Sequence, residues 1–304
     1  MGRMKVKDAS GEVECPVSFL LGFGAQKSGS TWLYRFLQSH PEAEMGSWKE
    51  YGFWDHYLLN DTGRQLEYGV RLNAILEKES EGNVDLLSAS ERNQKAGLSL
   101  ALELMGKLPQ YLEHFCGLAH SRPTVRLVGD ITPSYCRLGS ENLREINSVI
   151  RGAGFVPKPV FILRDPATRI LSALDMKLRR QRRDVKLLSD SELEGEILEM
   201  ATSPGAKVRT AYRHTVKSLE EGFGVGNVFF GFYETFFSIG EMSRLLDFLN
   251  LSWLNPPFQT RVNRAKNSAC LRGDIKRQIR ELYSEEYEYC DRRFPEAKLD
   301  QLWC

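Results

Sequence analysis

The chain has almost no excess of charge of either sign. Its 41 Lys and Arg residues against 40 Asp and Glu residues leave a formal net charge of +1. Nothing global therefore favours nucleic acid or an anionic membrane as a partner, and a basic site would have to be local. The longest apolar stretch, near residues 16–25, is far shorter than the roughly 20 residues that span a bilayer. A glycine-rich turn follows it, which is untypical of a signal peptide. We therefore expect a soluble, cytoplasmic protein.

Metal-binding patterns are also missing. None of the six cysteines forms a C-x-x-C pair, so a zinc site is not expected and no metal requirement is indicated. We expect reduced, partly buried thiols, with a Cys270–Cys290 bridge as the alternative if the protein is exported. The 304 residues are enough for one large α/β domain. We expect residues 1–304 to form it, with 1–15 loosely held and 60–95 making a short helix plus a surface excursion.

Apolar runs alternate with segments of helical period. Strands are expected at residues 17–23, 124–128, 159–163 and 228–233, and helices at residues 31–39, 97–116, 141–150, from Pro166 onward, 239–249 and 273–293. Strands separated by helices imply a central parallel sheet flanked by helices in three layers. Ligands of such sheets bind at the carboxyl ends of the strands.

The most informative stretch is Gly-Ala-Gln-Lys-Ser-Gly-Ser-Thr-Trp at residues 24–32, directly after the first expected strand. A strand, a tight glycine turn and a helix start together form a cradle for one anion. A nucleoside-triphosphate P-loop reads G-x-x-x-x-G-K-[ST]. Gly24, Gly29 and Thr31 have that spacing, but Ser30 stands in the lysine position and the lysine is Lys27. The loop is therefore expected to hold a terminal 5′-phosphate group rather than a metal-bound triphosphate.

Residues 27–33, Lys-Ser-Gly-Ser-Thr-Trp-Leu, resemble the 5′-phosphosulfate loop of sulfotransferases that use 3′-phosphoadenosine 5′-phosphosulfate (PAPS). Four later segments resemble further family motifs in the right order, and their pattern is most similar to the carbohydrate and heparan-sulfate branch. These segments are Lys49-Glu50 followed by Phe53-Trp54, Gly129–Tyr135, the R-x-P-x-x-R-x-x-S motif over residues 164–172, and Phe232-Tyr233-Glu234. The fold that the resemblance implies is the P-loop-containing three-layer α/β fold.

The resemblance implies donor-site roles for specific residues. Lys27 would neutralise the leaving 5′-phosphate of the nucleotide, whose desulfonated product is PAP. Ser28, Gly29, Ser30 and Thr31 would supply hydrogen-bond donors to the same phosphate. Trp32 and Tyr233 would contact the adenine; the alternative for Trp32 is a core residue of the helix. Arg164 and Ser172 would bind the 3′-phosphate, a group that ATP lacks; the alternative is that Arg164 pairs with a carboxylate. Arg264 and Lys266 would cover the 3′-phosphate.

The acceptor must lose a proton, and two carboxylates are candidates for the base. Glu50 matches the glutamate that carbohydrate-type relatives use, although Lys49 beside it would lower its basicity; a surface Lys–Glu pair is the alternative. Asp130 is a second candidate at an expected strand end, where a capping or loop hydrogen bond is the alternative role. The five histidines lie in no recognisable base motif and are expected to be structural or superficial.

The acceptor itself is open: a hydroxyl or an amine, on a glycan or a small polar metabolite. A basic run is either a solvated helix face or a patch that recruits an anionic acceptor; it comprises Lys177, Arg179, Arg180, Arg182, Arg183 and Lys186. The aromatic residues Tyr51, Phe53, Trp54 and Tyr57 could instead line a cleft for a flat or apolar acceptor.

We therefore predict a PAPS-dependent sulfotransferase. Two alternatives remain. A nucleotide-dependent phosphotransferase would need a lysine at position 30, which is absent, and a magnesium-binding aspartate after an apolar strand, which Asp130 fits only loosely. A non-catalytic PAP- or PAPS-binding protein would bind the donor without transfer.

Overall fold

The computed structural model describes residues 16–80, 87–259 and 273–303. Within these residues the core is a parallel sheet of five strands in the order β2-β3-β1-β4-β5. The strands are β1 (Ser18–Gly24), β2 (Ala43–Glu44), β3 (Leu127–Ile131), β4 (Val156–Leu163) and β5 (Phe229–Phe232). The predicted fold class, a central parallel sheet flanked by helices, is confirmed.

Helices connect and cover the strands. The α-helices are α1 (Ser30–Gln38), α2 (Phe53–Leu59), α3 (Gly63–Ser80), α4 (Ala89–Leu104), α5 (Leu108–Ala119), α6 (Ser140–Gly152), α7 (Pro166–Arg180), α8 (Asp190–Thr202), α9 (Pro204–Thr210), α10 (Tyr212–Phe223), α11 (Tyr233–Phe236), α12 (Ile239–Leu249), α13 (Gly273–Leu282), α14 (Ser284–Arg293) and α15 (Leu299–Leu302). Short 3₁₀ turns are η2 (Pro133–Arg137), η3 (Val185–Leu187) and η4 (Pro295–Ala297).

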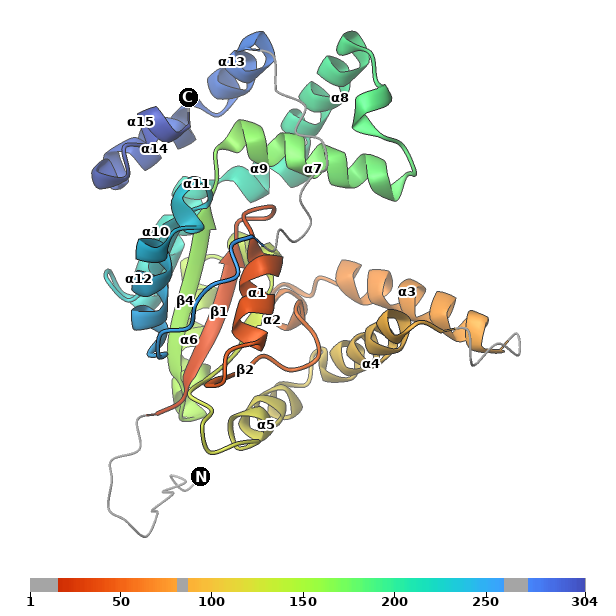
Figure 1. Ribbon diagram of the computed structural model, residues 1–304, viewed down its shortest axis with the longest axis vertical. Helices are drawn as coiled ribbons and strands as arrows, with labels where there is room; N and C mark the ends of the chain where they lie inside the picture. The colour runs from red at the N-terminus through yellow and green to blue at the C-terminus, as the bar shows by residue number, and fades with distance from the viewer. Residues whose placement is uncertain (1–15, 81–86, 260–272, 304) are drawn as a thin grey trace.

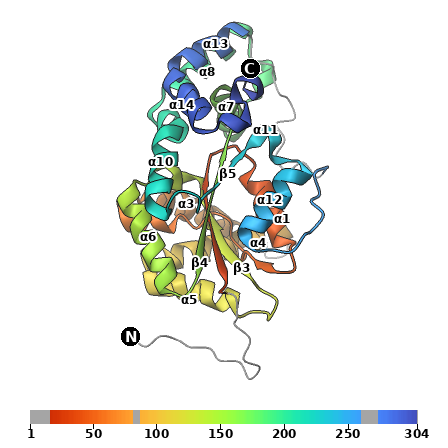
Figure 2. The ribbon, with the colours of Figure 1, turned by 90° about the vertical axis from the view of Figure 1, so that its left-hand side faces the viewer.

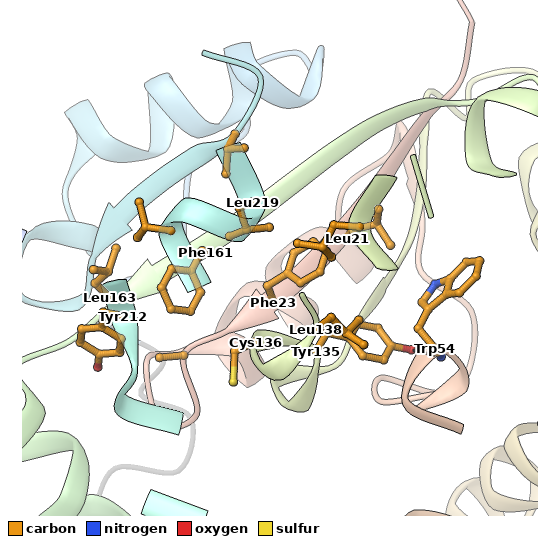
Figure 3. Packing of buried hydrophobic residues seen from close by; sticks show 14 of the residues in the cluster. Leu21, Phe23, Trp54, Tyr135, Cys136, Leu138, Phe161, Leu163, Tyr212 and Leu219 are labelled. Carbon is orange, nitrogen blue, oxygen red and sulfur yellow. Dashed lines mark hydrogen bonds between the residues drawn. The ribbon is translucent and has the colours of Figure 1, made fainter. Parts of the chain in front are cut away.

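The central strand β1 is buried along its whole length, as expected of a parallel strand with helices on both faces. Its side chains alternate between two cores. Phe19, Leu21 and Phe23 point into a cluster shared with α5, α6 and α10, part of which Figure 3 shows. Leu20 points into the other cluster, against α1 and α12. Figure 2 shows α6 and α10 on one side of the sheet and α1 and α12 on the other.

Gly129 permits the close pairing of β3 with β1. A Cβ atom at this position would lie 2.4 Å from the carbonyl oxygen of Leu20, so any larger residue would push the two strands apart. This pairing brings the carboxyl ends of β1 and β3 to the same edge of the sheet. Helices α7, α8, α9 and α13 gather beyond that edge (Figure 1).

Several expected boundaries differ from the structure. The strand expected at residues 124–128 occupies Leu127–Ile131, and β2 was not predicted. The expected helix 97–116 is two helices that meet near Gly106, whose φ of +75° is left-handed. The expected helix 273–293 is likewise divided into α13 and α14. Residues 60–80 and 87–95 are more regular than the surface excursion expected over 60–95, because α3 packs against α4 over a small apolar cluster that contains Tyr68, Ile75 and Leu98. Residues 1–15 lie outside the described part.

Candidate functional site

The turn after β1 presents an uncapped helix start. Helix α1 begins at Ser30, and its N-cap residue Gly29 supplies no side-chain hydrogen bond. The first N–H groups of a helix have no partner within it, so the N–H groups that begin at Ser30 are available to an anion. Gly29 has a φ of +85°, and a Cβ atom there would lie 3.2 Å from Phe237 Cζ. The glycine therefore allows both the left-handed turn and the close approach of Phe237, the residue that follows α11.

Ser28 carries an unsatisfied polar atom within this turn. The residue is 1% exposed, and its hydroxyl oxygen has no hydrogen-bond partner among the described residues. A buried hydroxyl without a partner is costly. An anion bound in the turn would supply the missing acceptor. Ser28 thus fits the donor-binding role predicted for it.

Lys27 lies in a cationic environment. Burial lowers its pKa from the ordinary value of 10.5, Asp175 opposes that shift, and Arg164, Arg179 and Arg180 lower the pKa further. Acids offset part of this repulsion, because Arg179 pairs with Asp175 and Arg180 with Glu67; an anion bound beside Lys27 would relieve the rest. The arrangement is therefore suited to a multiply charged anionic ligand such as a phosphate.

Arg164 connects this turn to the end of β4. Its Nη1 donates to the carbonyl oxygen of Lys27 at 2.6 Å, and its Nε donates to Thr168 Oγ1 at 3.2 Å. Its Cζ lies 4.2 Å from the centre of the Tyr233 ring, within cation–π range. A guanidinium has five N–H donors, and the described residues occupy two of them. The structure thus brings together Lys27, Arg164 and Tyr233, three of the predicted donor-site residues.

The remaining residues predicted to bind the donor are Ser172, Trp32, Arg264 and Lys266. Ser172 lies on α7, two turns beyond Arg164, and is half-buried. Trp32 is only 5% exposed; it stacks on Phe36 and Phe258 at centroid distances of 5.3 and 5.9 Å. This packing favours the core role for Trp32 over contact with adenine. Arg264 and Lys266 lie outside the described residues.

Glu50 is held by two cations. Its carboxylate accepts from Lys49 Nζ at 2.5 Å and from Arg64 Nη1 at 3.1 Å, and its side chain is 33% exposed. Burial raises the pKa of Glu50, but Lys49 and Arg64 outweigh burial and lower it below the ordinary value of 4.5. Ile131 N–H donates to the Lys49 carbonyl oxygen, which places Glu50 beside the carboxyl end of β3. It is thus an ionised carboxylate within reach of solvent.

Asp130 corrects one expectation. It lies inside β3 rather than at its end and is fully buried. Its carboxylate accepts from Thr132 and Tyr135 at 2.6 Å each and from Tyr111 at 3.2 Å. Burial raises its pKa to about 6, although the hydroxyl donors oppose the shift. These contacts support the hydrogen-bonding role that was the alternative to catalysis.

The aromatic residues and the basic run that were expected near the acceptor differ from that expectation. Tyr51, Phe53 and Trp54 are at most 1% exposed, so they belong to the core and do not line a cleft. Much of the basic run is paired with acids: Lys177 and Arg183 with Glu196 on α8, Arg179 with Asp175, and Arg180 with Glu67 on α3. This pairing favours the solvated-face interpretation for most of the run. Arg179 and Arg180 nevertheless lie close enough to Lys27 to lower its pKa.

The histidines were expected to be structural or superficial and the thiols reduced and partly buried; the contacts of His40 and His114 agree with a structural role. His40 is 2% exposed and bonds to the Ser252 carbonyl oxygen, and His114 bonds to the Tyr51 hydroxyl. Cys116, Cys136 and Cys290 are free thiols; Cys270 lies outside the described residues. In the part of the chain that the structure describes, no group of three or more His, Cys, Asp or Glu residues could hold a metal ion.

Sequence reasoning missed two features of the site. Asp175 acts on Lys27 from α7, and its position three residues after Ser172, on the same helix face, was the available signal. Trp303 reaches the site from the far end of the chain, where its Nε1 donates to Glu234 at 3.0 Å. No local pattern predicts that contact.

A parallel α/β sheet with a glycine turn and an uncapped helix start after its central strand is typical of phosphate- and nucleotide-binding proteins. A sequence profile described as the Sulfotransferase family matches residues 20–255. Because the match covers more than half of the chain, the protein belongs to the sulfotransferase family. Helices α13–α15 lie beyond the matched span. No curated protein matches the chain.

One solved structure supports the fold, and two others are weaker matches. A sulfotransferase from Alicyclobacillus acidocaldarius aligns with a TM-score of 0.56 at 18% identity, over 92% of this chain and 95% of that one. A sulfotransferase domain from the olefin synthase of Synechococcus PCC 7002 has a TM-score of 0.45 at 16% identity, covering 92% and 98%. One from the curacin biosynthetic pathway has a TM-score of 0.45 at 17% identity, covering 79% and 76%. Among the described residues, no helix is long and apolar enough to cross a membrane.

Proposed function

We propose that the protein transfers a sulfuryl group from PAPS to a hydroxyl or amine of an acceptor. The observation that carries the proposal is the hydrogen bond from Arg164 to the Lys27 carbonyl oxygen. It joins the motif expected to bind the 3′-phosphate to the loop expected to bind the 5′-phosphosulfate. The order of the motifs is most similar to the carbohydrate and heparan-sulfate branch, whose acceptors are glycans; a small polar metabolite is the other acceptor class.

The reaction would break the bond between sulfur and the 5′-phosphate oxygen of PAPS and form a bond between sulfur and the acceptor atom. Negative charge grows on the leaving phosphate, and Lys27 with the N–H groups of the turn would stabilise it. The acceptor proton would pass to Glu50, which its two cations hold ionised at neutral pH. The same cations weaken Glu50 as a base, so we expect positioning and charge stabilisation to provide most of the rate enhancement.

The donor is tested by calorimetric binding of PAP, ATP and ADP to the wild type and to Arg164→Ala. We expect PAP to bind most tightly, and the variant to lose about 1.5–3 kcal/mol of PAP binding, the contribution of a charge-assisted hydrogen bond. Arg151→Ala is the matched control, because Arg151 is exposed on α6 and bonds to Asn147. ATP binding as tight as PAP binding, and indifferent to Arg164, would return the chain to the phosphotransferase alternative.

Turnover separates an enzyme from a binding protein. Incubation with sulfur-labelled PAPS and a panel of glycan and metabolite acceptors should give labelled product and PAP. Tight PAP binding with no transfer to any acceptor would favour the non-catalytic alternative. A cytoplasmic location remains an expectation from the sequence.

A further inference from the structure

The C-terminal helices contact the donor site through two acidic residues. Glu234 follows Tyr233 at the end of β5, and Asp165 follows Arg164 at the end of β4. Arg164 and Tyr233 are thus each followed directly by an acidic residue. Both acids are contacted by residues 276–303, which lie beyond the span that the family profile matches.

Glu234 connects the backbone of Asp165 to Trp303 through its two carboxylate oxygens. One of its carboxylate oxygens accepts from the backbone N–H of Asp165 at 3.0 Å, and the other accepts from Trp303 Nε1 at 3.0 Å. The carbonyl oxygen of Arg164 accepts from the Tyr212 hydroxyl at 2.7 Å. The peptide unit between Arg164 and Asp165 is therefore held at both its carbonyl and its N–H group.

The side chain of Asp165 is also held by residues of the C-terminal helices. It is 2% exposed; the Tyr287 hydroxyl donates to one carboxylate oxygen, and Lys276 Nζ lies 3.6 Å from the other. Trp303 is 1% exposed and packs edge-on against Tyr287, with ring centres 5.8 Å apart. The C-terminal contacts thus form one buried, hydrogen-bonded unit behind Arg164.

We propose that Trp303 and Glu234 are positioning residues that hold Arg164 in the orientation that binds the 3′-phosphate of the donor. The inference rests on the proposed function. Neither residue needs to touch the nucleotide. Their effect passes through the Arg164–Asp165 peptide and through Tyr233, whose ring lies against the Arg164 guanidinium.

A comparison of two nucleotides tests this role, because 5′-AMP is PAP without its 3′-phosphate. Trp303→Phe keeps an aromatic ring and removes the N–H donor. We expect it to weaken PAP binding by about two- to tenfold, the effect of one lost hydrogen bond, and to leave 5′-AMP binding, measured by competition with PAP, unchanged. In the Arg164→Ala background, Trp303→Phe should have no further effect.

Two further variants keep the test decisive. Glu234→Gln replaces one acceptor oxygen with an NH₂ group, so it should give the same selective loss of PAP binding, even if Trp303→Phe folds poorly. Tyr283→Phe is the matched control. It removes a hydrogen bond from the C-terminal segment to the Ala201 carbonyl oxygen, away from Asp165 and Glu234, and should leave PAP binding unchanged.

Equal weakening of PAP and 5′-AMP binding would overturn the inference, because it would indicate general loosening of the site. An undiminished effect of Trp303→Phe in the Arg164→Ala background would also overturn it. If PAP binding depends on Arg164 but not on Trp303 or Glu234, this inference fails and the proposed function stands. If the wild type does not bind PAP, both fail.

Discussion

At the scale of single residues, charge placement separates the acids of this protein into different roles. Glu50 is partly exposed and paired with two cations. Asp130 is buried among hydroxyl donors, and burial raises its pKa to about 6. Environments that push the pKa values of two carboxyl groups apart assign them different functions. Glu50 therefore remains the proposed base, and Asp130 is a structural acid.

If Glu50 is the base, its pKa controls the acid limb of activity. Arg64→Met removes a cation that lowers this pKa, so the limb of kcat/KM should move up by about one pH unit. The measurement is the pH profile of sulfuryl transfer. Arg71→Met is the control, because Arg71 lies on the same helix and pairs with Glu67 instead. An unmoved acid limb in Arg64→Met would exclude Glu50 as the titrating base.

At the scale of elements, the unit that makes the site is β1, its turn and α1. Three features agree in this segment: an uninterrupted buried strand, a left-handed glycine and a helix start without a side-chain cap. Local sequence specifies each of them, so the predicted strand and helix lie within one residue of the observed ones. The short strand β2 has two residues, and only its pairing with β3 defines it as a strand.

Gly29→Ala tests the geometry of this unit. The left-handed φ at position 29 costs a non-glycine residue about 1–2 kcal/mol, and the added Cβ would approach Phe237. We expect lower thermal stability and markedly weaker PAP binding. Gly117→Ala is the control: this exposed glycine of α5 has no atom within 4 Å of an added Cβ, so alanine should stabilise the helix by up to about 1 kcal/mol. Unchanged PAP binding in Gly29→Ala would show that the turn does not form the phosphate cradle.

At the scale of the whole molecule, the sheet order brings distant parts of the chain to one edge. The turn after β1, Arg164 after β4 and Tyr233 after β5 meet there because β1, β4 and β5 are parallel neighbours. Glu50 lies beside β3 on the other side of β1. The proposed donor groups and the proposed base thus flank the central strand.

The free energy of unfolding should depend on pH through the ionisation of Asp130. Its folded-state pKa of about 6 lies above the ordinary value of about 3.9, so folding favours the protonated form. The stabilisation that protonated Asp130 gives to the folded state is fully present below about pH 4 and is lost as pH rises to about 6. The free energy of unfolding should fall by at most about 3 kcal/mol over this range. Denaturant unfolding from pH 4 to 7 should show this fall in the wild type and in the exposed-residue control Asp247→Asn, but not in Asp130→Asn. An equal fall in Asp130→Asn would assign it to other groups.

The sequence alone determined the class of fold, the glycine turn between β1 and α1, and the motif order, because each depends on residues close together in the chain. The helix at Ile239–Leu249 was predicted to the residue, since its apolar period and serine N-cap are local signals. Only the tertiary structure decided which aromatic residues are buried, that Asp130 lies inside a strand, and that Arg179 and Arg180 approach Lys27. It also decided that Trp303 reaches Glu234, a contact between residues 69 positions apart. Such contacts depend on how helices pack beyond the sheet, and no local pattern of residues encodes that packing.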